Sequence, residues 1–122
     1  MKMNATADAI QTLLESHHAR TYRNRAPQKP VFPYVVFRLE SVIDTTPSDD
    51  LYLNVDIYDS ADSIRVIEDL ADKIDNDLNG KIINTDIMNL HFVREQRQFV
   101  PSEQLVSANL LNLRYVVRAY YK

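Results

Sequence analysis

The sequence predicts one α+β domain with two layers, in which two helices pack on one face of a four-stranded, mainly antiparallel sheet. Three observations lead to this fold class. Two segments repeat apolar residues at spacings of three and four, as amphipathic helices do. Four segments alternate apolar and polar residues, as half-buried strands do. The chain has 122 residues, a length typical of a single domain, so residues 1–122 are expected to share one core.

The expected elements follow one another in the order α-β-β-α-β-β. They are a helix over residues 5–17, strands over 33–40 and 51–59, a helix over 60–79, and strands over 85–100 and 110–121. Residues 18–33 are expected to form a loop, because three prolines and four cationic side chains argue against regular structure there. Two amphipathic helices cannot cover both faces of a four-stranded sheet, so both are expected on the same face.

The second helix has the clearest pattern. We expect Ser60 to cap its start, because a serine side chain can accept a hydrogen bond from a free N–H of the first turn. We expect Gly80 to end it, because glycine adopts the left-handed conformation after a helix without steric cost. The apolar residues between these ends lie within about 80° on a helical wheel. They are Ile64, Ile67, Ala71, Ile74 and Leu78.

The face of the sheet without helices is expected to combine tyrosine, valine and arginine. Its residues would be Tyr34, Val36, Arg38, Tyr52, Asp56, Tyr58, Arg114, Val116, Arg118 and Tyr120. Such a mixture is more typical of a protein interface than of a solvated surface. The alternative is that the tyrosines stabilise an exposed sheet through cross-strand pairs.

Charge is distributed unevenly along the chain, although the net charge is only −3. Residues 40–77 carry twelve acidic and two basic side chains, whereas residues 1–39 carry six basic and two acidic ones. Opposite charges of this kind can attract a rotated copy of the same chain, and an ordinary solvated surface is the other interpretation. Glu68, Asp72 and Asp75 form an acidic stripe on the second helix. They could face a basic neighbour, a channel through which DNA slides, or water.

Few residue patterns point to catalysis or to a bound cofactor. There is no cysteine, and the three histidines lack the spacing of metal ligands. No serine lies in a nucleophile motif, and one glycine is too few for a phosphate-binding loop. No apolar run is long enough to span a membrane, and the first twenty residues lack the apolar block of a secretory signal. We therefore expect neither an enzyme nor a cofactor, metal or membrane partner.

Three segments carry a resemblance to a known family. They are Pro33-Tyr34-Val35-Val36-Phe37, Val55-Asp56-Ile57-Tyr58-Asp59 and Leu113-Arg114-Tyr115. With the order of elements between residues 5 and 121, the chain resembles the small tail-completion, or head-to-tail joining, proteins of long-tailed bacteriophages and prophages. It is similar, more loosely, to their tail terminators.

The resemblance implies a structural protein of the virion that forms a hexameric ring at the head-proximal end of the tail. Such a ring ends growth of the tail tube and joins the tail to the head connector, and DNA passes through its lumen as cargo. The expected partners are therefore other copies of the chain, the tail tube protein and the head-completion or connector protein. The expected location is the tail or neck of the virion, after assembly in the bacterial cytoplasm.

The resemblance and the residue pattern together suggest which residues meet other molecules. The expected subunit or partner interface consists of Arg20, Arg23, Arg25, Tyr34, Arg38, Tyr58, Glu68, Asp72, Asp75, Arg114, Arg118 and Tyr120. The expected loop contacts to the tail tube or connector are Asp44, Asp49, Asp50, Glu103 and Gln104. Alternatives are a neck adaptor on the portal side of the head, a protein-binding module that forms no ring, and a small enzyme.

Overall fold

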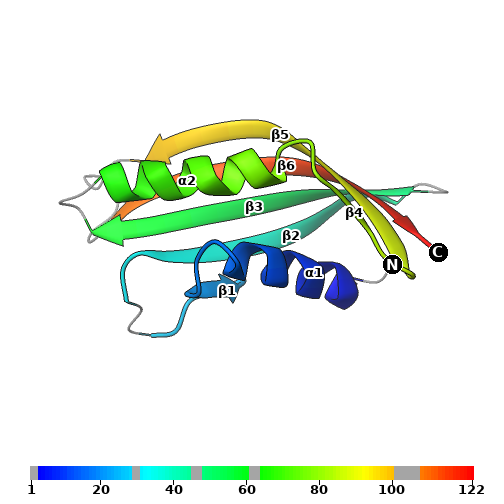
Figure 1. Cartoon of the computed structure of the whole chain (residues 1–122), viewed down its shortest axis with the longest axis horizontal. Helices are drawn as coiled ribbons and strands as arrows, with labels where there is room; N and C mark the ends of the chain where they lie inside the picture. Colours follow the sequence, from blue (N-terminus) through cyan, green and yellow to red (C-terminus); the bar gives the residue numbers. More distant parts are fainter. Residues whose placement is uncertain (1–2, 29–30, 45–47, 61–63, 101–107) are drawn as a thin grey trace.

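A computed structural model of the chain describes residues 3–28, 31–44, 48–60, 64–100 and 108–122. These residues form two helices and six strands in the order α-β-β-β-α-β-β-β (Figure 1). The elements are α1 (Met3–Glu15), β1 (Thr21–Arg23), β2 (Tyr34–Asp44), β3 (Ser48–Ser60), α2 (Arg65–Leu78), β4 (Ile82–Asn84), β5 (Met88–Val100) and β6 (Ala108–Tyr121).

All six strands belong to one twisted sheet with the order β1-β2-β3-β6-β5-β4. The four central strands pair antiparallel with one another, and the edge strand β1 is parallel to β2. The expectation of a four-stranded, mainly antiparallel sheet is therefore wrong, because the sheet is mixed and has two further strands at its edges. Both edge strands are three residues long. Three residues are too few to display a period of two, so sequence alternation cannot reveal them.

Alternate residues of the central strands form the core on one face of the sheet, here named the covered face. Leu51, Leu53, Val55 and Ile57 of β3 have no exposed surface. Each of them lies opposite an apolar residue of β6 in the antiparallel register. The period of two places every second side chain on this face, so each strand contributes an unbroken apolar row.

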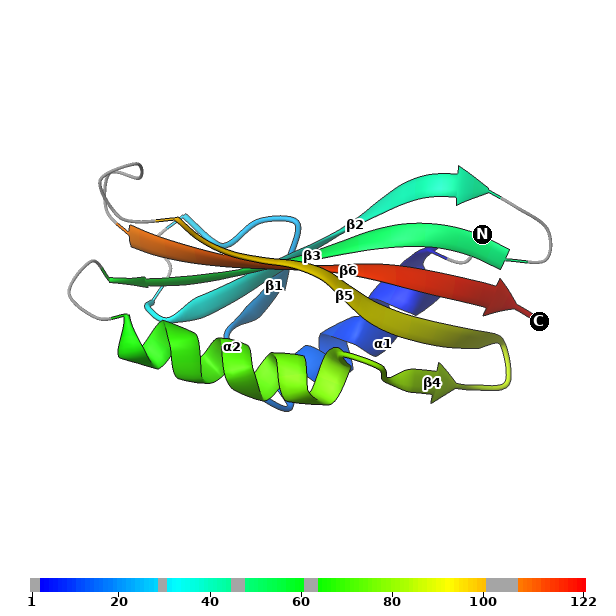
Figure 2. The same ribbon diagram turned by 90° about the horizontal axis from the view of Figure 1, so that it is seen from above.

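Both helices lie against the covered face (Figure 2). α1 contributes Ala7, Ile10 and Leu14 to the core. α2 contributes a wider stripe made of Ile67, Leu70, Ala71, Ile74 and Leu78. Ile64, which we expected in this stripe, precedes the first turn of α2 and is 57% exposed. Neither of these two helices covers the opposite face of the sheet.

The two expected signals at the ends of α2 have different outcomes. Ser60 is the last residue of β3, and α2 begins five residues later without a side-chain cap, so the expected cap is wrong. Gly80 has a φ of +82°, which confirms that it takes the left-handed conformation after the helix. A Cβ at this position would meet no atom within 4 Å. The requirement for glycine therefore comes from the backbone conformation and not from crowding.

Asp77 links the end of α1 to the end of α2. Its Oδ2 lies 2.7 Å from Nε2 of His17, and its Oδ1 accepts a hydrogen bond of 3.0 Å from Nζ of Lys81. The hydrogen bond with His17, followed by that from Lys81, lowers the pKa of the Asp77 carboxyl. A lowered pKa in the folded state means that the ionised carboxylate stabilises the fold.

We expect Asp77→Asn to lower the free energy of unfolding by about 0.5–1 kcal/mol at pH 7, since the contact is partly exposed. The contribution is complete above the ordinary aspartate pKa of 3.8 and is lost as the pH falls through the lower pKa of the folded state. Urea unfolding at pH 7 and at pH 2.5 (about a unit below that ordinary value) measures both effects. The gap between the two proteins should be smaller at the lower pH. Asp69→Asn, an exposed position on the same helix, is the matched control. An equal loss in both variants at pH 7 would contradict the assignment.

Candidate functional site

The face of the sheet opposite the helices, here named the open face, collects six of the twelve predicted interface residues. It is made by the alternate residues of the central strands that do not point into the core. Those on β2, β3 and β6 are Tyr34, Val36, Arg38, Tyr52, Asn54, Asp56, Tyr58, Leu110, Asn112, Arg114, Val116, Arg118 and Tyr120. The sequence placed its members correctly because β2, β3 and β6 alternate without interruption where they pair here.

Four aromatic rings form a cluster at one end of the open face. Tyr34 stacks on Tyr58 of the neighbouring strand with a centroid distance of 4.9 Å. Phe32 stacks on Tyr34 at 5.5 Å, and Tyr22 of β1 meets Tyr34 edge to face at 6.4 Å. Burial raises the pKa of Tyr34, and burial followed by the charge of Asp56 raises that of Tyr58. The hydroxyls of Tyr34 and Tyr58 therefore stay neutral near pH 7, and the cluster presents large apolar surfaces with polar tips.

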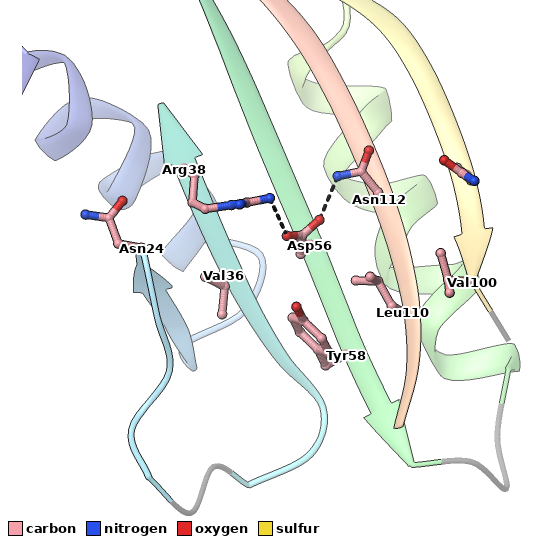
Figure 3. A pocket seen from close by; sticks show the side chains of 9 residues that line it. Asn24, Val36, Arg38, Asp56, Tyr58, Val100, Leu110 and Asn112 are labelled. Carbon is pink, nitrogen blue, oxygen red and sulfur yellow. Dashed lines mark hydrogen bonds and ion pairs between the residues drawn. The ribbon is translucent and has the colours of Figure 1, made fainter. Parts of the chain in front are cut away.

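Beside this cluster lies a hollow of about 390 Å³ (Figure 3). Asp56 lies at its centre, with only 6% of the residue exposed. Its two carboxylate oxygens accept hydrogen bonds from Arg38 at 3.3 Å and from Asn112 at 2.6 Å. Val36, Tyr58, Val100 and Leu110 supply apolar walls, and Asn24 and Gln98 complete the lining. A buried carboxylate needs such partners, because burial without them would be costly.

Arg114 lies farther along β6 and covers the ring of Tyr52. Its guanidinium carbon is 3.8 Å from the ring centroid, which is a cation–π contact. Its Nε is closed off from solvent and has no hydrogen-bond partner among the residues that the structure describes. Stacked arginines and tyrosines of this kind are enriched at the centres of protein interfaces.

A second, smaller hollow of about 280 Å³ lies on the open face beyond Arg114. His91, Val93 and Val116 line it together with Arg118 and Tyr120. The Tyr120 ring meets His91 edge to face at 5.8 Å. Arg118 donates a hydrogen bond of 3.3 Å to Asp50, and this bond raises the pKa of the fully exposed guanidinium. Val93 is 60% exposed, so an apolar side chain stands uncovered at this hollow.

The arginines of the first loop lie apart from this face and have different roles. Arg20 donates a hydrogen bond of 3.0 Å to the carbonyl of Pro33, which fixes the loop against the start of β2. Arg23 of β1 donates one of 3.0 Å to the side chain of Asn4 in α1. Arg25 is exposed. The structure does not bring these three arginines together with Arg114 and Arg118.

The acidic stripe of α2 finds basic partners within the chain. Arg97 of β5 forms ion pairs with Glu68 at 2.5 Å and with Asp72 at 2.8 Å. Arg97 donates both hydrogen bonds, and the one to Asp72, followed by the one to Glu68, raises the pKa of Arg97. Arg94 pairs with Asp75 at 2.6 Å. The stripe therefore ties α2 to β5, and each of its three carboxylates already has an arginine partner within the chain. Sequence reasoning missed both arginines as partners, because only the strand register shows that they face the helix.

The predicted loop contacts fall partly outside the described residues. Glu103 and Gln104 lie outside them, and so does the side chain of Asp44, whose backbone belongs to β2. Asp49 belongs to β3 and is 7% exposed on the covered face. Asp50 is the partner of Arg118 described above. The connection between the strands expected over 33–40 and 51–59 is shorter than expected, since β2 extends to Asp44 and β3 begins at Ser48.

The described part of the chain holds no group of three or more histidine and carboxylate side chains able to bind a metal ion. Neither α1 nor α2 has the length and apolar character that crossing a lipid bilayer requires. No known protein-family model matches the chain, and a search of curated proteins found no relative. The chemistry of the open face is therefore the basis for a functional proposal. It offers stacked aromatic rings, one arginine over a tyrosine, and two hollows.

Proposed function

We propose that this chain is a structural subunit of a long-tailed phage or prophage, which forms a ring at the head-proximal end of the tail. The ring ends growth of the tail tube and joins the tail to the head connector. The observation that carries the proposal is the open face. Neither of the two described helices covers this side of the sheet, and it carries aromatic, apolar and arginine side chains. This composition is that of a surface that another protein covers.

The open face supports binding of another protein better than it supports a reaction. Its one buried carboxylate, Asp56, has both oxygens engaged by Arg38 and Asn112. Its apolar surface is spread over two shallow hollows and not gathered into one enclosed pocket. We assign the open face to contacts with the tail tube or the connector. The acidic stripe of α2 contributes less to this proposal than its charge suggests, because Arg94 and Arg97 pair with all three of its carboxylates within the chain.

Native mass measurements with and without tail tubes test the proposal. A hexamer of 14.2 kDa subunits is a particle of about 85 kDa. We expect such a particle at high protein concentration, or rings that cap tail tubes of the encoding phage or prophage in negative stain. Rings that bind the connector and ignore the tubes would favour a neck adaptor instead. A chain that stays monomeric and binds neither tubes nor connector would overturn the proposal.

A further inference from the structure

We propose that copies of this chain join head to tail, with the free part of β5 in one copy pairing with the free part of β2 in the next. This inference rests on the self-assembly in the proposed function and identifies the junction. Main-chain pairing between sheet edges is a common way for proteins to associate. The junction is argued from the backbone of the two edges and not from the open face.

Each edge of the sheet is covered over only part of its length. β1 pairs with β2 at residues 35–37, so the described part of β2 from residue 38 onward has no strand on its outer side. β4 pairs with β5 at residues 89–91, and the later part of β5 likewise has no outer strand. The two short strands cover opposite ends of the sheet (Figure 2). The free stretches are therefore also at opposite ends.

On β2, the outward backbone groups follow a simple alternation. The N–H of Val35 and the C=O of Phe37 form hydrogen bonds of 2.9 and 2.8 Å on the β1 side. In an antiparallel pair every second residue directs both groups away from its partner strand. Leu39 and Ser41 are the next two residues in this series. A register shift between Ser41 and Ile43 then ends the regular stretch.

On β5, the outward backbone groups alternate in the same way, but a bulge changes which residues carry them. The N–H and C=O of Phe92 bond to the segment before β4, and the N–H of Arg94 donates to Oδ1 of Asn79 at 2.9 Å. The register shift between Arg94 and Gln96 inserts one residue. After it, Arg97 and Phe99 direct their backbone groups outward. Among the described residues, these outward groups have no backbone partner.

The two regular stretches are compatible in direction and face and can be aligned over four residues. Residues 38–41 of β2 lie between the segment paired with β1 and the register shift, and residues 97–100 of β5 lie beyond the bulge, so each of the four residues on β2 can face one on β5. β2 and β5 run in opposite directions, because the three pairings between them are all antiparallel. Antiparallel pairing with outward residues opposed places Leu39 beside Phe99 and Glu40 beside Gln98. Leu39 and Phe99 both lie on the covered-face side, so the helices of both copies stay on one side.

Charge and apolar surface favour the head-to-tail junction over pairings related by a two-fold axis. If β2 paired antiparallel with β2 of another copy, again with the outward-directed residues opposed, Glu40 would lie opposite Glu40. Like charges in directly opposed positions are destabilising. Pairing of β5 with β5 would leave both β2 edges open. The head-to-tail junction opposes no like charges and covers Phe99, which is 37% exposed. A heterologous junction of this kind closes into a ring when its rotation allows closure.

Cysteine cross-linking tests the junction directly, because the chain contains no cysteine of its own. Glu40 and Gln98 are both exposed, so Glu40→Cys and Gln98→Cys should leave the fold intact. Directly opposed residues of an antiparallel pair lie within disulfide reach. Under mild oxidation we expect the double variant to form a covalent ladder of multimers. An equimolar mixture of the two single variants should form dimers only, and each single variant alone should stay monomeric on a denaturing gel.

The control and the contrary results separate this junction from the proposed function. Glu40→Cys combined with Val93→Cys, an exposed position on the same strand as Gln98, should give no ladder. Dimers from Gln98→Cys alone would show a two-fold β5 pairing and overturn the head-to-tail junction. Wild-type rings in native mass measurements with no ladder from the double variant would overturn the junction and leave the ring standing. Monomers throughout, with no ladder, would overturn the junction together with self-assembly of the free chain.

Discussion

Replacing Tyr115 with alanine is expected to lower the free energy of unfolding by about 3–5 kcal/mol. Tyr115 is the largest side chain with no exposed surface in the described structure, and it lies on β6 beneath α2. Its removal would leave a cavity between the helix layer and the sheet, and packed interiors collapse only partly around such cavities. Urea unfolding followed by circular dichroism measures the loss. Val66→Ala, at an exposed apolar position of α2, is the control and should cost far less.

Tyr115→Phe separates the hydroxyl group from the ring. The hydroxyl donates a hydrogen bond of 2.7 Å to Oδ1 of Asp75, whose other oxygen pairs with Arg94. Hydrogen bonds to charged groups contribute about 1.5–3 kcal/mol, so the phenylalanine variant should lose a smaller but measurable part. Burial, followed by the hydrogen bond to Asp75, raises the pKa of Tyr115. The wild type should therefore lose stability as the pH rises above the ordinary tyrosine value of 10.0, and the variant should lose less. If Tyr115→Phe and the wild type have the same free energy of unfolding, the hydrogen bond from the hydroxyl to Asp75 does not contribute to stability.

The helices and central strands could be predicted because each has a long periodic pattern. In α2, Ile67, Ala71, Ile74 and Leu78 were expected on one stripe, and all four are buried. The pattern does not say where the helix begins. Ser60 has the chemistry of a helix cap, yet the pairing of β3 with β6 continues through it. The local sequence permits Ser60 either to cap a helix or to continue a strand, and the pairing with β6 decides for the strand.

The edge strands could not be predicted, and they change the architecture most. β1 lies in a proline-bearing segment that reads as a loop, and its pairing is with a strand that begins eleven residues after it ends. Its parallel direction follows from the path of that loop and leaves no mark in its three residues. β4 directly follows the turn at Gly80, where the hydrogen bonds of Phe92 draw the chain alongside β5. Such contacts depend on the folded sheet and not on local periodicity.

For the candidate site, sequence alternation identified the open face but not its internal partners. Arg38, Asp56 and Arg114 were expected on one face, and they lie there. The engagement of Asp56 by Asn112 and the stacking of Arg114 on Tyr52 required the register of β3 against β6. The partners of the acidic stripe of α2 were even harder to predict from the sequence. The register shift after Arg94 is what brings Arg97 to the helix side, and strand alternation without that shift would place it on the open face.

Arg114→Glu is expected to reduce capping of tail tubes at least about tenfold, because an arginine at the centre of an interface contributes a large share of binding. Arg114 lies between the two hollows of the open face, so a partner that fills both must pass over it. The residue is partly exposed, so the guanidinium can donate to a carbonyl or carboxylate of a partner. The fraction of capped tubes in negative stain, at equal protein concentration, measures the effect.

Two further variants make the Arg114 result specific. Arg114→Met keeps a long side chain over Tyr52 but removes the charge, so it separates loss of the charge from loss of the fold. We expect it to cap tubes less well than wild type and better than Arg114→Glu. Arg65→Glu makes the same change of charge at the exposed start of α2, where the helix dipole tolerates an acid, and should cap tubes normally. Circular dichroism melting confirms that each variant folds. If folded Arg114→Glu caps tubes as well as Arg65→Glu does, the open face is not the surface that meets the tail.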